Sequence, residues 1–147
     1  MKSFRSANEV LNFAIAKEIA AHDFYVELAE WAERPEAAKA FEDLAAQELQ
    51  HKIKLEAIKA GKAAIEDEEV GSLGIAETVE AAEPQANLTY AQALAVAMQR
   101  EKDAFRLYTH LASMSRERET TTILSRLAQE EAQHKLQLEI EYDLTTF

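Results

Sequence analysis

Two stretches of the sequence are nearly the same. Residues 43–56 read DLAAQELQHKIKLE and residues 126–139 read RLAQEEAQHKLQLE, so the second copy lies 83 positions after the first. In each copy a glutamate stands three residues before a histidine. The two pairs are Glu48 with His51 and Glu131 with His134. On an α-helix this spacing separates two side chains by about 60° around the axis, so both can face one point beside the helix.

The repeat extends well upstream of these pairs. Residues 18–56 align with residues 101–139 without a gap, and this alignment matches Glu18 with Glu101 and Tyr25 with Tyr108. The sequence therefore predicts one helical hairpin that is used twice.

The composition favours an all-α fold. Apolar residues make up 48% of the chain, which has only three glycines and two prolines. Apolar positions recur every three or four residues, and in the second helix they include Phe41, Leu44, Ile53, Leu55 and Ile58. Capping and turn residues predict four helices. These run from Ser6 to about Glu33, from Pro35 to Gly61, from Thr89 onward, and from about Glu119 to the low 140s.

The order of these segments predicts a four-helix bundle of two repeated helical hairpins. Hairpin one covers about 7–60 and hairpin two about 89–145, and we expect residues 1–147 to form a single domain. The segment 61–88 connects the hairpins, and its residues 62–88 hold two of the three glycines, a proline and an acidic run. It is long enough to return along the whole bundle, and we expect it to be a long crossover with a short helix near 75–82.

Composition also excludes several classes of function. The chain has no cysteine, so it has no disulfide, thiol nucleophile or cysteine-held metal. A formal net charge of −11 argues against nucleic acid or an anionic membrane surface as a partner. No apolar run approaches the roughly 20 residues needed to cross a bilayer. The start, MKSFRSANEV, shows no secretory signal, and we expect a cytoplasmic protein.

The two-hairpin arrangement predicts where the polar core residues meet. In an antiparallel pair, residues equidistant from the turn lie at the same height. Glu18 and Glu48 are centred on residue 33, within the turn signal at 33–36, and Glu101 and Glu131 are centred on residue 116. Four glutamates and two histidines should therefore converge.

Charge balance indicates what such a cluster would hold. Four ionised carboxylates buried together would be very unfavourable unless they were compensated, and two divalent cations supply the four positive charges required. Oxygen-rich coordination with one imidazole for each ion suits iron or manganese. Structural zinc prefers nitrogen and sulfur ligands, and calcium and magnesium rarely bind histidine. Manganese and zinc remain possible substitutes for iron.

The same motifs resemble those of a known family. The chain resembles the ferritin-like superfamily, and within it the rubrerythrin family, whose bundle combines lone glutamates with Glu-x-x-His pairs. The stretches KEIAAHDFYVELA and REKDAFRLYTHLA are similar to that family's lone-glutamate helices. LAAQELQHKIKLE and LAQEEAQHKLQLE are similar to its Glu-x-x-His helices. Bacterioferritin shares this pattern of six ligands.

The resemblance implies a role for each residue. Glu18 and Glu101 would be terminal ligands, one for each of two iron ions. Glu48 and Glu131 would bridge the ions, and His51 and His134 would each bind one. Tyr25 and Tyr108 resemble hydrogen-bond donors to the ligand carboxylates, next to the reacting site.

The chain departs from its relatives at three places. Rubrerythrins carry an additional glutamate on the third helix, where this chain has Ala104, matched in the repeat by Ala21. The sequence shows no cysteine-rich stretch like the rubredoxin-like domain of that family, so we expect electrons to come from a separate donor protein. The haem-binding methionine of bacterioferritin is replaced by Leu49 and Ala132, so we expect no haem.

Three functions are consistent with this resemblance. The first is a rubrerythrin-like di-iron oxidoreductase that reacts with peroxide or dioxygen, in a role in oxidative stress, using an external electron donor. The second is a ferritin-like protein that binds, oxidises or stores iron. The third is a structural dimer that holds zinc or no metal. The repeat of one apolar face also favours a homodimer, which would exchange hairpins if the long connector allows it.

Overall fold

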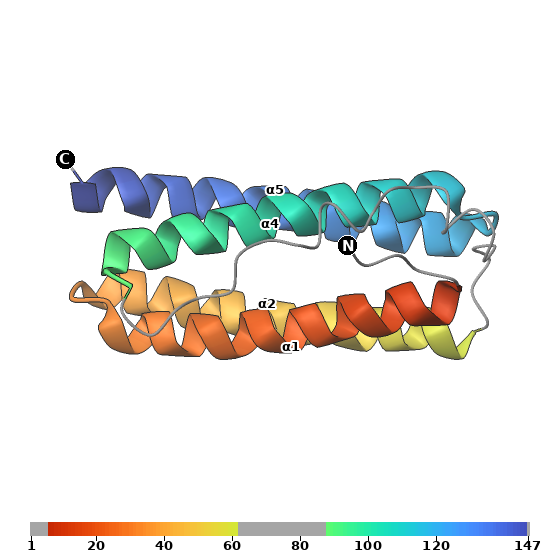
Figure 1. Ribbon diagram of the computed structural model, residues 1–147, viewed down its shortest axis with the longest axis horizontal. Helices are drawn as coiled ribbons and strands as arrows, with labels where there is room; N and C mark the ends of the chain where they lie inside the picture. Colours follow the sequence, from red (N-terminus) through yellow and green to blue (C-terminus); the bar gives the residue numbers. More distant parts are fainter. Residues whose placement is uncertain (1–5, 62–87, 147) are drawn as a thin grey trace.

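The computed structural model describes residues 6–61 and 88–146, and four α-helices account for nearly all of this part of the chain. They are α1 (Ala7–Trp31), α2 (Pro35–Ala60), α4 (Tyr90–Met114) and α5 (Arg118–Thr146). Figure 1 shows them side by side as a bundle. The prediction of an all-α four-helix bundle is confirmed.

The helix ends follow from local chemistry. The Ser6 hydroxyl accepts a hydrogen bond from the Glu9 N–H at 3.1 Å. Thr89 and Gln92 form a complete capping box at the start of α4. Arg34 stands before the proline that begins α2 and has an extended backbone, as the residue before proline prefers. This break explains why α1 ends at Trp31, slightly earlier than predicted, whereas α5 continues slightly beyond the predicted low 140s.

The helices pack as two hairpins. α1 packs mainly on α2 and α4 on α5, and the hairpins meet where α1 faces α4 and α2 faces α5. The end of α2 and the start of α4 lie at opposite ends of the bundle (Figure 1). The predicted crossover, with its short helix near 75–82, lies outside the described residues.

One acidic side chain ties the hairpins together at one end. Glu141 of α5 forms an ion pair with Arg34, in the turn between α1 and α2. The Tyr90 hydroxyl at the start of α4 donates a hydrogen bond to the other carboxylate oxygen of Glu141 at 2.9 Å. The Arg34–Glu141 ion pair therefore joins the two hairpins at this end of the bundle, and the Tyr90 hydrogen bond joins α4 to α5 there.

The core consists of two apolar clusters separated by a polar layer. One cluster includes Leu11, Leu55, Leu111 and Leu124, and the other includes Leu28, Phe41, Leu94 and Leu138. On every helix the buried glutamate of the polar layer falls between residues of these two clusters. The layer is thus sealed along the bundle axis from both sides.

One predicted core position is wrong. Ile53 is 53% exposed, because the buried stripe of α2 passes from His51 to Leu55 and Ile58 at helical spacing. Ile53 lies on the opposite side of α2 from that stripe.

None of the helices in the described ranges carries an apolar stretch that could cross a membrane.

Candidate metal centre

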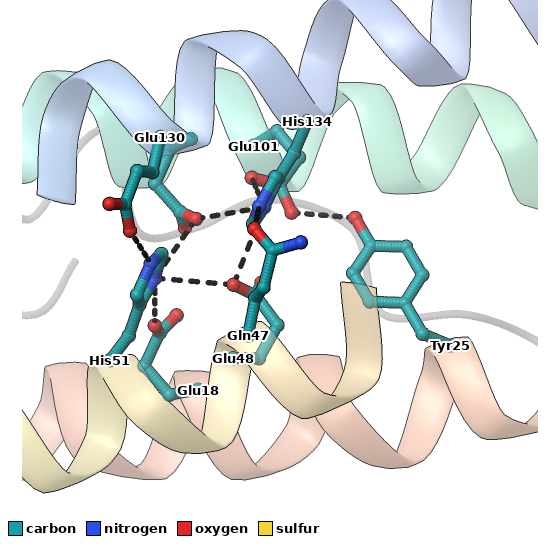
Figure 2. Close-up of polar contacts among 9 residues, drawn as sticks. Glu18, Tyr25, Gln47, Glu48, His51, Glu101, Glu130 and His134 are labelled. Carbon is teal, nitrogen blue, oxygen red and sulfur yellow. Dashed lines mark hydrogen bonds and ion pairs between the residues drawn. The ribbon is translucent and has the colours of Figure 1, made fainter. Parts of the chain in front are cut away.

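The polar layer is made of the six residues that the sequence predicts. Each helix contributes its buried glutamate, and α2 and α5 each add a histidine one turn later. All are at most 2% exposed: Glu18, Glu48, His51, Glu101, Glu131 and His134. Figure 2 shows that the labelled members of this set point into the space between the two hairpins.

These side chains form two overlapping groups. One group contains Glu18 and His51, the other contains Glu101 and His134, and Glu48 and Glu131 belong to both. Within each group the potential ligand atoms lie within 4.8 Å of one another. Ligands bound roughly 2.1 Å from one ion lie at most roughly 4.2 Å apart, so small side-chain movements would close each group around a cation.

His51 faces three carboxylates with a single nitrogen. Its Nδ1 lies 2.9 Å from Oε2 of Glu18, 3.2 Å from Oε1 of Glu48 and 3.1 Å from Oε1 of Glu131. One nitrogen carries at most one hydrogen and cannot satisfy all three.

His134 repeats this arrangement in the other group. Its Nδ1 lies 3.2 Å from Oε1 of Glu131 and 3.5 Å from both Oε1 of Glu48 and Oε2 of Glu101. The two imidazole rings are nearly parallel, with an interplanar angle of 6° and centroids 5.7 Å apart. The layer is therefore close to symmetric in its inner contacts.

Seven buried polar atoms of this layer have no hydrogen-bond partner among the described residues. They are Oε2 of Glu18, both Oε1 and Oε2 of Glu48, Nδ1 of His51, Oε2 of Glu101, Oε1 of Glu131 and Nδ1 of His134. Although several of these atoms are close together, their contacts lack hydrogen-bond directions. Buried polar atoms are rarely left unsatisfied. A set of lone pairs that all face one space fits two metal cations.

Two further residues hold the outer nitrogens of the histidines. Nε2 of His51 lies 2.8 Å from Oε1 of Glu130, and Nε2 of His134 lies 2.7 Å from Oε1 of Gln47. Both oxygens are acceptors, so each Nε2 carries the hydrogen. Each contact crosses from one hairpin to the other (Figure 2). Sequence reasoning missed this pair, although Gln47 and Glu130 are matched by the repeat.

The two predicted tyrosines differ in their contacts. The Tyr25 hydroxyl donates a hydrogen bond to Oε1 of Glu101 at 2.6 Å, which leaves Oε2 of Glu101 facing the centre. Glu101 belongs to the other hairpin, so this hydrogen bond joins α1 to α4. Tyr108 is also buried, but within the described residues its hydroxyl has no hydrogen bond to Glu18. Tyr108 instead lines a cavity beside the layer.

Burial shifts the pKa values of the carboxyls. Desolvation, with the charge of Glu131, raises the pKa of Glu18 to about 8 and that of Glu101 to about 7. The same two causes raise the pKa of Glu48 well above its ordinary value. In Glu131 burial acts in the same direction, but His134 and His51 overcome it and lower the pKa to about 2.

The pKa values of both histidines are raised, although burial alone would lower them. Burial alone would lower the pKa of His134, but the carboxylates of Glu101 and Glu131 raise it to about 9. The pKa of His51 also rises, because the carboxylates of Glu131, Glu18 and Glu48 outweigh desolvation. In the metal-free protein, protons thus provide the positive charge that this cluster of carboxylates needs.

A small cavity connects the layer with the groove between α1 and α4. Its volume is about 50 Å³. A buried water occupies roughly 10–15 Å³ by this measure, so the space fits only a few small molecules. Half-buried Lys17, Arg100 and Asp103 line it together with Ala21 and Ala104. All four glutamates of the layer also contribute to its wall.

The donor set determines what the layer can do chemically. It offers carboxylate oxygens and imidazole nitrogens and no sulfur, which suits first-row transition metals such as iron and manganese. Two shared carboxylates hold the two positions next to each other. A small molecule in the cavity would reach this pair directly.

Comparisons with known proteins identify the fold and the family of this chain. A solved structure described as a ferritin-like diiron-carboxylate protein from Thermotoga maritima matches with a TM-score of 0.77. The match covers 99% of this chain and 100% of that chain at 22% identity, which shows a shared ferritin-like fold. No curated protein matches the chain. The family model of rubrerythrin matches residues 9–142, which include all four helices nearly to their ends. The chain therefore belongs to the rubrerythrin family.

Proposed function

We propose that this protein is a di-iron oxidoreductase that reduces peroxide or dioxygen with electrons from a separate donor protein. The observation that supports it most strongly is the convergence of seven unpartnered buried polar atoms from six side chains at one level of the bundle. Membership of the rubrerythrin family favours iron as the metal.

Each side chain has a definite task in this proposal. Glu18 and His51 would hold one ion, Glu101 and His134 the other, and Glu48 and Glu131 would bridge them. Two iron ions would supply one electron each, which together with two protons convert one hydrogen peroxide to two waters. Oε1 of Glu101 accepts the Tyr25 hydrogen bond, so Oε2 is the oxygen that would bind the metal.

The cavity favours a small oxidant as the mobile reactant. Its volume of about 50 Å³ admits peroxide or dioxygen and excludes larger organic substrates. This small volume supports a reaction with a small oxidant as the proposed activity.

The proposal is tested by kinetics of the iron-loaded protein. Elemental analysis of protein purified without added metal identifies the native metal. Stopped-flow absorbance then follows oxidation of the Fe(II) form by peroxide and by oxygen, and re-reduction by a rubredoxin-type donor. The variant Glu139→Gln, on the exposed side of α5, is the matched control for substitutions of ligand glutamates. We expect oxidation by one oxidant followed by repeated re-reduction.

Other outcomes would identify the competing functions. Accumulation of iron well beyond two ions per chain, without re-reduction by a donor, would support a ferritin-like ferroxidase or storage protein. Purification with zinc, or with no metal, and no reaction of the iron-loaded protein would support a structural role. Either result would overturn the proposed activity.

Metal binding should release protons. In the metal-free protein the pKa values of Glu18, Glu48, Glu101, His51 and His134 are all raised, so several of these groups hold protons at pH 7. Binding of two ions should therefore displace several protons. Calorimetric titration with Mn(II) in buffers of different ionisation enthalpy measures this number. Release of no protons would contradict a site built on these side chains.

The Tyr25 hydroxyl should contribute to stability. Tyr25→Phe removes its hydrogen bond to Glu101 and leaves a buried carboxylate oxygen without a partner. We expect a loss of about 1.5–3 kcal/mol in the free energy of unfolding, measured by urea titration of the metal-free protein. Tyr108→Phe is the matched control and should cost clearly less. Equal losses in the two variants would refute the distinction.

The proposal also includes a homodimer. Leu136, Ile140 and Leu144 recur every four residues along α5 and are all more than half exposed. Light scattering should give twice the mass of one chain, and Ile140→Glu should shift it to that of one chain. A monomeric wild-type protein would contradict this part of the proposal. Exchange of hairpins depends on the connector, which lies outside the described residues.

A further inference from the structure

The outer contacts of the two histidines break the symmetry of the repeat. His51 donates its Nε2–H to a carboxylate, Glu130, whereas His134 donates its Nε2–H to an amide, Gln47. The two contacts are otherwise alike, with distances of 2.8 and 2.7 Å and the same cross-hairpin geometry. The repeat thus keeps the hydrogen bond and changes only the charge of the acceptor.

This change affects the nitrogen that faces the metal. A negatively charged acceptor draws the Nε2 hydrogen toward itself more strongly than a neutral one does. The imidazole then carries more electron density on Nδ1, which makes it a stronger metal ligand. His51 should therefore bind a cation more tightly than His134.

The terminal carboxylates differ in the same direction. Glu101 accepts a short hydrogen bond from Tyr25, which reduces the negative charge that it offers to a cation. Glu18 receives no such bond from Tyr108 within the described residues. Glu18 and His51 thus form the stronger half of the centre.

We propose that the two metal positions are unequal, and that the position at Glu18 and His51 fills first while the position at Glu101 and His134 holds the more exchangeable ion. Glu130 and Gln47 are the positioning residues that set this order. The inference rests on the metal centre of the proposed function and does not depend on its oxidant or donor.

The order of filling is measured with Zn(II), which is diamagnetic and redox-inactive. Zn(II) is added to the metal-free, ¹⁵N-labelled full chain while the imidazole nitrogen signals of both histidines are followed by NMR. We expect the His51 signals to change over the first equivalent and the His134 signals over the second. Parallel changes of both histidines from the start would overturn the proposal.

Two substitutions between glutamate and glutamine, which are nearly equal in size, test in opposite directions whether the charge of the acceptor sets the order of filling. Glu130→Gln should weaken the first binding step by about tenfold, and Gln47→Glu should strengthen the second by about tenfold. Glu139→Gln and Gln137→Glu make the same changes at exposed positions of α5 and should leave both steps unaltered. An unchanged order in Glu130→Gln and in Gln47→Glu would overturn the assignment. A complete lack of zinc binding in the wild type would instead refute the metal centre itself.

Discussion

Replacing Glu131 with alanine is expected to remove nearly all bound metal from the protein. Glu131 belongs to both ligand groups and lies close to both histidines. The substitution takes one ligand from each position and also leaves the two ions without one of their bridges. We expect the metal content after anaerobic loading with Fe(II) and desalting to fall from two ions per chain to almost none, measured by elemental analysis.

Glu18→Ala provides the comparison that makes this result specific. Glu18 belongs to only one group, so its loss should leave one ion bound in the group of Glu101 and His134. Both variants remove a fully buried glutamate, so a general effect of burial would act on them alike. A Glu131→Ala protein that still holds two ions, or equal metal loss in the two variants, would contradict the bridged arrangement.

Removal of the metal should lower the melting temperature by a large amount. A ligand present at 100 times its dissociation constant stabilises the fold by about 2.7 kcal/mol, and two ions contribute about twice that. For a chain of this size such a difference corresponds to a shift of about 10–20 °C. Calorimetry of metal-free and Mn(II)-loaded protein at pH 7.5 measures it. Equal melting temperatures would argue against a buried metal centre.

This shift should grow as the pH rises. In the metal-free protein the pKa of Glu18 is raised to about 8, so this carboxyl stabilises the fold below about pH 4.5 and loses that effect as the pH rises through about 8. The raised pKa of His134 acts likewise, and its stabilisation is lost between about pH 6.5 and 9. Glu131, with its lowered pKa, loses stabilisation only as the pH falls from about 4.5 toward 2.

The free energy of unfolding of the metal-free protein should therefore fall as the pH rises from about 5 to about 8. As the pH rises through this range, fewer protons compete with the metal ions for the ligands. The metal ions therefore bind more tightly. The difference in melting temperature between the two forms should be smallest near pH 5 and largest near pH 8. A difference that is independent of pH would show that the protons and the metal do not share these side chains.

Much of this structure could be predicted from the sequence because the repeat constrains it twice. The Glu-x-x-His pairs occur in both copies, and the turn signals place Glu18 and Glu101 level with them. Periodicity, caps and turn residues gave the four helices to within a few residues. The position of the site depends only on which residues lie at the same height in the two hairpins. The turn positions in the sequence determine these heights.

The parts that could not be predicted depend on how the two hairpins face each other. Gln47 and Glu130 contact the histidine of the opposite hairpin, and Tyr25 contacts Glu101 in the same way. Such contacts follow from packing between hairpins and not from spacing within one. Ile53 was misplaced because alternating apolar and polar residues around it left the buried face of α2 ambiguous. The cytoplasmic location and the single-domain organisation stay predictions.

The central claim is that four glutamates and two histidines hold two metal ions side by side. Anomalous diffraction at the iron absorption edge, from crystals of protein loaded with Fe(II) without oxygen, tests it most directly. We predict two peaks between the hairpins, one within bonding distance of His51 Nδ1 and the other within bonding distance of His134 Nδ1, both in contact with Glu48 and Glu131. A single peak, or iron bound only at the surface, would contradict the account.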